Sequence, residues 1–177
     1  MIYTLDTEFI EDGKTIELIS IGIVAEDGRE FYAEVPKLDW SNASQWVMDN
    51  VRPNLWHLKS EAEKIPFNKW IRDGGVGGLL SRNAIRHEIR EFIDRNQSIE
   101  FWSYYGDYDW VALCQLFGTM IDLPEGYPMY CRDLKQEIDR LGLDIHQDDS
   151  IHNALEDARW IMKTLKALQA LKPKELE

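Results

Sequence analysis

The sequence predicts an α/β protein with a mixed sheet, an antiparallel meander of three strands plus parallel strands, flanked by helices. Three apolar, β-branched runs occupy most of the first 35 residues, and acidic-glycine turns separate them. After residue 80, segments with apolar residues at helical spacing alternate with short strand-like runs. Hairpins followed by alternating helices and strands indicate helices packed over a mixed sheet.

Composition predicts one domain over residues 1–177, because a chain with 44% hydrophobic and 11% aromatic residues can bury a single sizeable core. No apolar run approaches the ~20 residues that span a bilayer, and the chain opens with strand-like sequence. We therefore expect a cytoplasmic protein without membrane contact. Cys114 and Cys131 are too few for a disulfide framework, so we expect reduced, mostly packed thiols.

The first three strands are predicted over residues 2–9, 15–25 and 29–35, with turns at Glu11-Asp12-Gly13 and Asp27-Gly28. A helix is predicted over about 41–51, with Ser41 or Asn42 as its cap and Pro53 after its end. Residues 54–80 contain Pro66 and the cluster Gly74 to Gly78, which favour an irregular excursion and a mobile loop near the mouth of the site. No Lys-Ser/Thr follows these glycines, so they are not a nucleotide-binding P-loop.

The second half is predicted to alternate between helices and strands. A helix follows Ser81, because apolar residues after it fall on one helical face, and a strand is expected over 98–105. A helix at about 107–118 precedes a turn and a short strand at 129–131. Further helices are expected at about 132–141 and 153–171.

Four acidic residues and one histidine carry the functional prediction. They occur in the order D-x-E, D and H-x-x-x-x-D, at Asp6, Glu8, Asp109, His152 and Asp157. Carboxylates that a fold brings together repel one another unless divalent cations neutralise them. The set therefore predicts a two-metal site that cleaves a phosphodiester, with the histidine deprotonating water.

Asp6 and Glu8 are two residues apart on a predicted strand, so their side chains emerge on the same face and one ion could contact both. D-x-E is also common in acidic chains, where it usually marks a solvated edge. Here the pair interrupts the most apolar early strand, which favours a functional role.

Asp107 and Asp109 compete for the middle position of the set. Asp107 follows Gly106 at the junction of a strand and a helix, where a carboxylate caps free N–H groups, so we assign capping to Asp107 and metal binding to Asp109. The alternative is that both are simply acids at the start of a helix.

The last helix places His152 beside Asp157. If Asn153 is the N-cap and Glu156 its capping-box partner, His152 and Asp157 take the two positions that touch in a hydrophobic staple. An imidazole then lies next to a carboxylate at the positive end of a helix. A lone histidine is more often structural, but this position favours a functional one.

The ordered set, with Tyr-Asp before Leu four residues later, resembles the DEDDh group of 3′-to-5′ exonucleases, which includes oligoribonuclease, ribonuclease T and proofreading domains. The stretches DTEFIEDGKTIELISIGIVAEDGREFYAEV and YDWVALCQLFG are similar to the small acidic exoribonucleases first described from mycobacteria. This resemblance covers nearly the whole chain. It implies a ribonuclease-H-like fold, two Mg2+ or Mn2+ ions, and stepwise release of nucleoside monophosphates from single-stranded 3′ ends or overhangs of RNA.

The resemblance also implies individual roles. Asp6, Glu8 and Asp157 would hold the ion that binds the attacking water, while Asp6 bridges to a second ion that Asp109 assists. His152 would take the proton. The sequence departs from many relatives at two places, with Phe9 where they have Thr or Met, and Tyr-Tyr at 104–105 where they have His-Asn.

Substrate contacts are expected from Thr7 and Phe9, which adjoin the metal pair. Aromatic rings stack on unpaired bases, and Trp46, Trp56 and Trp110 are further candidates. Since most tryptophans in a small domain are core residues, we favour Phe9 alone.

The net charge of -12 indicates weak, length-limited RNA binding, because no basic stripe is present and a short 3′ end needs few phosphate contacts. A DNA-directed 3′-to-5′ exonuclease would use the same five residues. A non-catalytic nucleotide-binding or scaffold module is the other alternative. The sequence also permits a homodimer.

Overall fold

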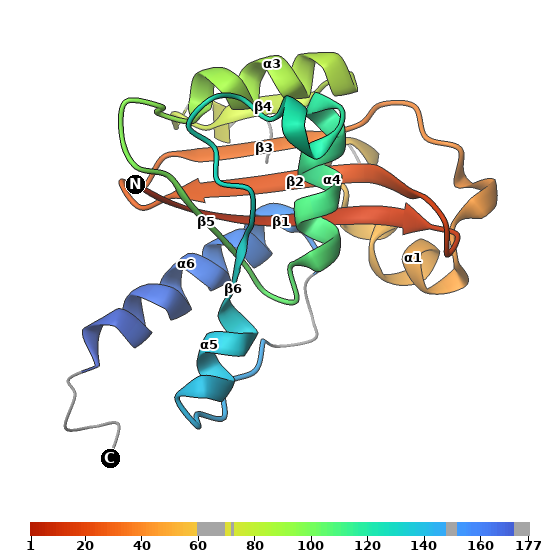
Figure 1. Cartoon of the computed structure of the whole chain (residues 1–177). Coiled ribbons are helices and arrows are strands. Elements are labelled where there is room, and N and C mark those ends of the chain that lie inside the picture. The colour runs from red at the N-terminus through yellow and green to blue at the C-terminus, as the bar shows by residue number, and fades with distance from the viewer. Residues whose placement is uncertain (60–69, 72, 148–151, 172–177) are drawn as a thin grey trace.

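The computed structural model describes residues 1–59, 70–71, 73–147 and 152–171 (Figure 1). Its centre is a six-stranded sheet in the order β4-β3-β2-β1-β5-β6. The β1-β2 and β2-β3 pairs are antiparallel and the other pairs are parallel, which confirms the meander and the mixed, ribonuclease-H-like sheet. The strands are β1 (Ile2–Glu11), β2 (Ile16–Ala25), β3 (Glu30–Glu34), β4 (Val76–Leu79), β5 (Glu100–Ser103) and β6 (Arg132–Asp133).

Helices cover both faces of the sheet (Figure 1). One face packs against α3 and α4, and the other against α6, with α5 beside α6. The helices are α1 (Gln45–Asn50), α3 (Arg82–Phe92), α4 (Asp107–Phe117), α5 (Leu134–Arg140) and α6 (Ala154–Ala170). Short 3-10 turns are η1 (Trp40–Asn42), η2 (Arg52–Asn54), η3 (Trp56–Leu58) and η4 (Met120–Asp122).

Alternation along β1 assigns its side chains to the two layers. Tyr3 and Leu5 are buried in the core beneath α3 and α4. Thr4 points the other way, where its hydroxyl donates to the Ala158 carbonyl of α6 at 2.7 Å. Asp6 and Glu8 continue this second series, so they face the side of the sheet that α6 covers.

The edge of β1 opens where the acidic residues begin. β2 pairs with β1 along nearly its whole length, whereas β5 pairs only with Ile2, Tyr3 and Thr4. From Leu5 onward, no strand among the described residues therefore pairs with β1 on that side. The chain leaves β5 after Ser103 and enters α4, which leaves space beside the acids.

Gly22 brings α6 close to the acidic stretch of β1. It is paired with Asp6 across the β1-β2 ladder. A Cβ at this position would lie 2.3 Å from the Ala154 carbonyl oxygen, so only glycine allows the first turn of α6 to approach β2 this closely. The start of α6 therefore packs on β2 at the residue that pairs with Asp6.

Two predicted boundaries were wrong. The helix expected over 41–51 begins at Gln45, and its cap is Ser44, whose side chain accepts the Val47 N–H. Asp39 accepts the Ser41 N–H and starts a 3-10 turn in the preceding residues. The short strand expected at 129–131 is formed instead by the next two residues, as β6.

The glycine cluster is not a loop at the site. Its residues from 76 onward form β4, the edge strand next to β3. The strands β3, β2 and β1 lie between β4 and β5. Glycine is needed for packing, because a Cβ on Gly77 would lie 1.9 Å from the Tyr32 carbonyl oxygen. A Cβ on Gly75 would lie 2.1 Å from the Trp70 ring. Pro66 lies outside the described residues.

Two expectations from composition can be compared with the structure. Cys114 is buried, Cys131 is half-buried, and both thiols are free. Within the described ranges, no helix combines the length and apolar character needed to cross a membrane.

Candidate active site

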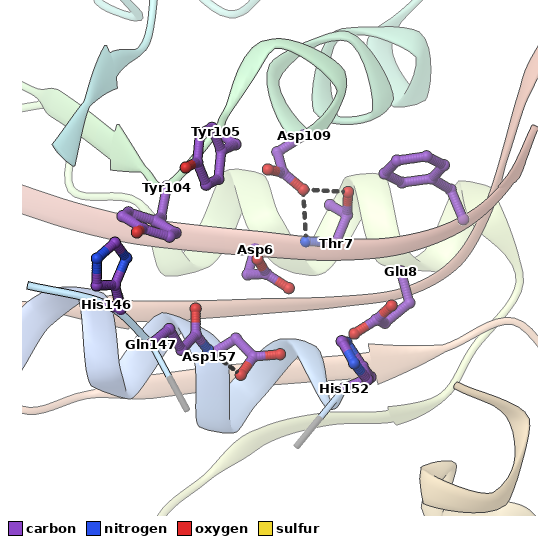
Figure 2. A pocket seen from close by; sticks show the side chains of 11 residues that line it. Asp6, Thr7, Glu8, Tyr104, Tyr105, Asp109, His146, Gln147, His152 and Asp157 are labelled. Carbon is purple, nitrogen blue, oxygen red and sulfur yellow. Dashed lines mark hydrogen bonds between the residues drawn. The ribbon is translucent and has the colours of Figure 1, made fainter. Parts of the chain in front are cut away.

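A cavity of about 590 Å³ lies at the open edge of β1 (Figure 2). Its walls come from β1, from the link between β5 and α4, from the start of α6 and from the segment before it. All seven residues predicted for the site line this cavity. The lining residues are Asp6, Thr7, Glu8, Phe9, Tyr104, Tyr105, Asp109, His146, Gln147, His152 and Asp157.

Three carboxylates converge in the cavity. Asp6, Glu8 and Asp157 each offer an oxygen, and these oxygens lie within 4.8 Å of one another. The two from β1 share a face, as the alternation of the strand requires, and Asp157 reaches them from the first turns of α6. Residues about 150 positions apart in the chain thus form one acidic group, as the sequence predicted.

The acids raise one another's pKa. Burial, followed by the charges of Asp157 and Asp109, raises the pKa of Glu8 to about 8. Burial also raises the pKa of Asp157 to about 7, although the Asn153 N–H opposes the shift. The pKa of Asp6 is raised well above its usual value by burial and by the neighbouring carboxylates.

This donor set fits a divalent cation. None of the cavity-lining residues in the described part of the chain is a lysine or arginine, so no side-chain cation offsets the carboxylates. Buried carboxylates without a compensating charge are costly, and oxygen donors are the ligands that Mg2+ and Mn2+ prefer. Asp6, Glu8 and Asp157 could therefore hold such an ion.

Asp109 approaches β1 from the α4 side of the sheet (Figure 2). Its Oδ1 accepts the Thr7 N–H at 2.8 Å and the Thr7 hydroxyl at 2.6 Å, and Ser103 Oγ lies 3.0 Å from its Oδ2. Asp109 thus accepts the backbone N–H of Thr7, which a neighbouring strand would otherwise bind. Burial raises its pKa to about 6, although these hydrogen bonds lower it. Asp109 lies outside the group of three, and its role toward a second ion stays a prediction.

The capping role assigned to Asp107 was wrong. Asp107 is the first residue of α4, and Gly106 is the N-cap, without a side-chain cap. The Gly106 N–H donates to Asp133 Oδ2 at 2.8 Å, so a carboxylate at the end of β6 satisfies it. A Cβ on Gly106 would lie 2.5 Å from the Ser103 Cβ, which explains glycine at this tight junction.

Asn153 is the N-cap of α6, as predicted, and its side chain accepts the Glu156 N–H at 3.3 Å. The capping-box partner is different. Glu156 accepts a hydrogen bond from Arg159, while Asp157 Oδ2 accepts the Asn153 N–H at 3.2 Å. The cap therefore also orients Asp157 toward the cavity.

His152 lines the cavity just before this cap (Figure 2). The Trp46 ring of α1 contacts its imidazole edge-on, with the ring centres 4.7 Å apart. Gln147, on the other side of the carboxylates, donates its amide to Asp157 Oδ1. Neither neighbour was identified from the sequence, because contacts between distant segments leave no local pattern.

A buried polar network lies beneath the cap of α6. The Asn153 amide donates to the Tyr32 hydroxyl at 3.1 Å, and that hydroxyl donates to Glu34 at 2.5 Å. Glu34 is fully buried and also accepts the Trp56 and His57 N–H groups at 2.6 and 3.0 Å. In the sequence, the only sign of this network is a glutamate at the end of an apolar strand.

Three of the aromatic residues considered for base stacking lie in different surroundings. Trp56 and Trp110 are buried core residues and lie outside the cavity wall. Phe9 is half-buried in the wall and meets Tyr108 edge-on, with ring centres 5.6 Å apart. Its contact with substrate, and that of Thr7, stay predictions.

Comparison with known proteins gives a consistent family match. A family model described as the 3′-5′ exoribonuclease Rv2179c-like domain matches residues 1–169. The proteins named 3′-5′ exoribonuclease Rv2179c and 3′-5′ exoribonuclease MT2234.1, from two strains of Mycobacterium tuberculosis, are each 44% identical to this chain over 163 residues. Each alignment covers 90% of this chain and 88% of the relative.

Proposed function

The chain belongs to the Rv2179c-like family of 3′-5′ exoribonucleases, hydrolases that act on nucleic acids, and we propose that it removes nucleoside monophosphates from single-stranded 3′ ends of RNA. One observation carries the proposal at the level of chemistry. Oxygens of Asp6, Glu8 and Asp157 converge within 4.8 Å in a cavity that His152 also lines. Converging carboxylates next to a histidine suit metal-assisted hydrolysis of a phosphodiester.

The carboxylates would bind Mg2+ or Mn2+. Asp6, Glu8 and Asp157 would hold one ion, and Asp6 with Asp109 would help to hold a second. Such ions supply Lewis-acid stabilisation of the phosphate and a bound water of lowered pKa. Because cations replace protons on these carboxylates, binding requires Glu8 and Asp157 in their charged forms.

His152 acts as the general base that takes a proton from the attacking water. Its position fits this role, because the ring lines the cavity and the edge of Trp46 restricts its orientation. Phe9 would contact the sugar or base, and Thr7 would do so through its backbone carbonyl, because Asp109 accepts both its hydroxyl and its N–H.

The test is degradation of a 3′-tailed RNA by the purified protein, with Mn2+ or with EDTA, followed by identification of the products. We expect metal-dependent release of nucleoside 5′-monophosphates from the 3′ end, and slower or no release from a DNA of the same sequence. Asp6→Asn, which keeps the side-chain shape, serves as the inactive control. Internal cleavage, or equal rates with EDTA, would contradict the proposal, and equal rates on DNA would remove the preference for RNA.

A further inference from the structure

Tyr105 combines two features that are unfavourable for a folded chain. Among the residues that the structure describes, it is the one non-glycine residue with a positive φ, at 57°. This left-handed region crowds the Cβ and is an outlier for a bulky side chain. The residue is also 65% exposed, so burial of the ring does not compensate for the backbone strain. Strain of this kind is concentrated at functional sites.

The conformation holds the ring at the wall of the active-site cavity. Tyr104 and Tyr105 link the end of β5 to α4, and both line the cavity. The centre of the Tyr104 ring lies 4.7 Å from that of Tyr105 and 5.0 Å from that of Trp160 in α6. Tyr104 therefore packs between Tyr105 and α6. Figure 2 shows the two tyrosines at one end of the cavity and Glu8 at the other, with Asp6 between them.

The charge of the cavity makes an aromatic contact important. Its described wall contains no lysine or arginine, and the whole chain has a net charge of -12. Phosphate contacts from basic side chains, which usually dominate affinity for nucleic acids, are therefore missing from this wall. Stacking of unpaired bases on aromatic rings is the other main source of affinity for single strands.

We propose that Tyr105 stacks on the base of one of the two nucleotides that the scissile phosphate joins, and so selects for ends with an unpaired base. This inference rests on the proposed function, because the phosphate must lie at Asp6 and its neighbouring carboxylates. A nucleotide on the side away from Glu8 would then meet the exposed tyrosine ring. Stacking tolerates any base, so Tyr105 would not select a sequence.

The test is a double-mutant cycle, in which Tyr105 is changed in the enzyme and one base is removed from the RNA. Wild type and Tyr105→Gly are assayed on RNA with all bases present and on RNAs that lack the terminal or the penultimate base. We expect Tyr105→Gly to lower kcat/KM on intact RNA by about 5- to 150-fold, the range for loss of one stacked base. At one of the two positions, removing the base should then lower the wild-type rate by a similar factor and the variant rate hardly at all.

Two further variants separate stacking from effects on folding. Tyr105→Ala also removes the ring but keeps a Cβ at positive φ, so it should melt about 2–4 °C below Tyr105→Gly while showing the same kcat/KM. Tyr130→Ala removes another exposed tyrosine, outside the active-site cavity, and should leave activity unchanged. Activity that follows melting temperature, rather than loss of the ring, would overturn the proposal.

The cycle is repeated on equilibrium binding of the same RNAs, with Ca2+ in place of Mn2+, by fluorescence anisotropy. This measurement needs no turnover. If the proposed function fails, the wild type does not degrade intact RNA, but coupling between Tyr105 and the base is still expected in binding. The role of Tyr105 would be overturned if loss of the ring and loss of the base had independent effects at both base positions. Their factors would then simply multiply, in binding and in any turnover.

Discussion

At the scale of single residues, the carboxylates of the cavity would make metal binding depend on pH. The pKa values of Glu8, Asp157 and Asp109 are raised to about 8, 7 and 6, above the ordinary values near 4 that apply in the unfolded chain. Below pH 4 these groups are protonated in both states. As pH rises toward 8, the folded state keeps protons that the unfolded state releases, so their contribution to stability is lost over this window.

We therefore predict that the metal-free protein loses melting temperature between pH 5 and pH 8, and that Mn2+ raises the melting temperature more at pH 8 than at pH 5. Differential scanning fluorimetry measures both effects. Asp157→Asn removes one of the charges, so the metal-free variant should show a weaker dependence on pH. An equal effect of Mn2+ at both pH values would contradict the assignment of these acids as its ligands.

His152→Ala tests the general base. We predict that kcat falls about 10²- to 10⁴-fold, the usual contribution of a positioned base, while the affinities for Mn2+ and RNA are retained. Steady-state kinetics and metal titration provide the measurements. His87→Ala is the matched control, because His87 is an exposed histidine of α3 outside the cavity, and its removal should leave kcat unchanged. Normal turnover by His152→Ala would exclude this histidine as the base.

At the scale of elements, the close approach of α6 to β2 decides whether the acids meet. We predict that Gly22→Ala lowers stability by about 1–3 kcal/mol and kcat by more than tenfold, because the new Cβ would lie 2.3 Å from the Ala154 carbonyl oxygen. The shift of α6 would move Asp157 away from Asp6. Chemical denaturation and steady-state kinetics on the same sample measure the two losses.

Gly13→Ala is the control for this prediction. Gly13 lies in the turn between β1 and β2 at a φ of 79°, with nothing close to a Cβ, so alanine there strains the backbone without touching the site. It should lower stability while leaving kcat near the wild-type value. If Gly22→Ala behaved like Gly13→Ala, the packing of α6 on β2 would not position the carboxylates.

The elements also separate what sequence can predict from what it cannot. Period-two alternation assigned Asp6 and Glu8 to one face, and the local signals at Asn153 identified the start of α6, because these features depend on near neighbours. The hydrogen bonds of Asp109 to Thr7 depend on an edge that β5 leaves open, which is a property of strand pairing across the fold.

The start of α1 and the glycine-rich edge strand were also mispredicted, because local sequence does not decide either of them. Asp39 and Ser44 are both good caps, and only the structure shows that the first begins a short turn and the second the helix. Gly77 permits contact with Tyr32 of the neighbouring strand, whereas in the sequence a run of glycines favours a loop.

At the scale of the whole molecule, the net charge of -12 bears on how strongly RNA binding depends on salt. Single strands release counterions roughly in proportion to the phosphates that basic groups neutralise. We predict that, at fixed excess Mn2+, raising monovalent salt from 50 to 200 mM increases KM by no more than about threefold, equivalent to one neutralised phosphate. A steeper dependence in steady-state assays would indicate a basic RNA path along the chain.

The central claim is that Asp6, Glu8 and Asp157 together hold a divalent cation at the open edge of β1. Anomalous diffraction from crystals grown with Mn2+ and a nucleoside monophosphate tests it most directly. We predict a manganese peak within coordination distance, about 2.0–2.6 Å, of oxygens from all three carboxylates. Well-ordered carboxylates with no manganese peak between them would contradict the account.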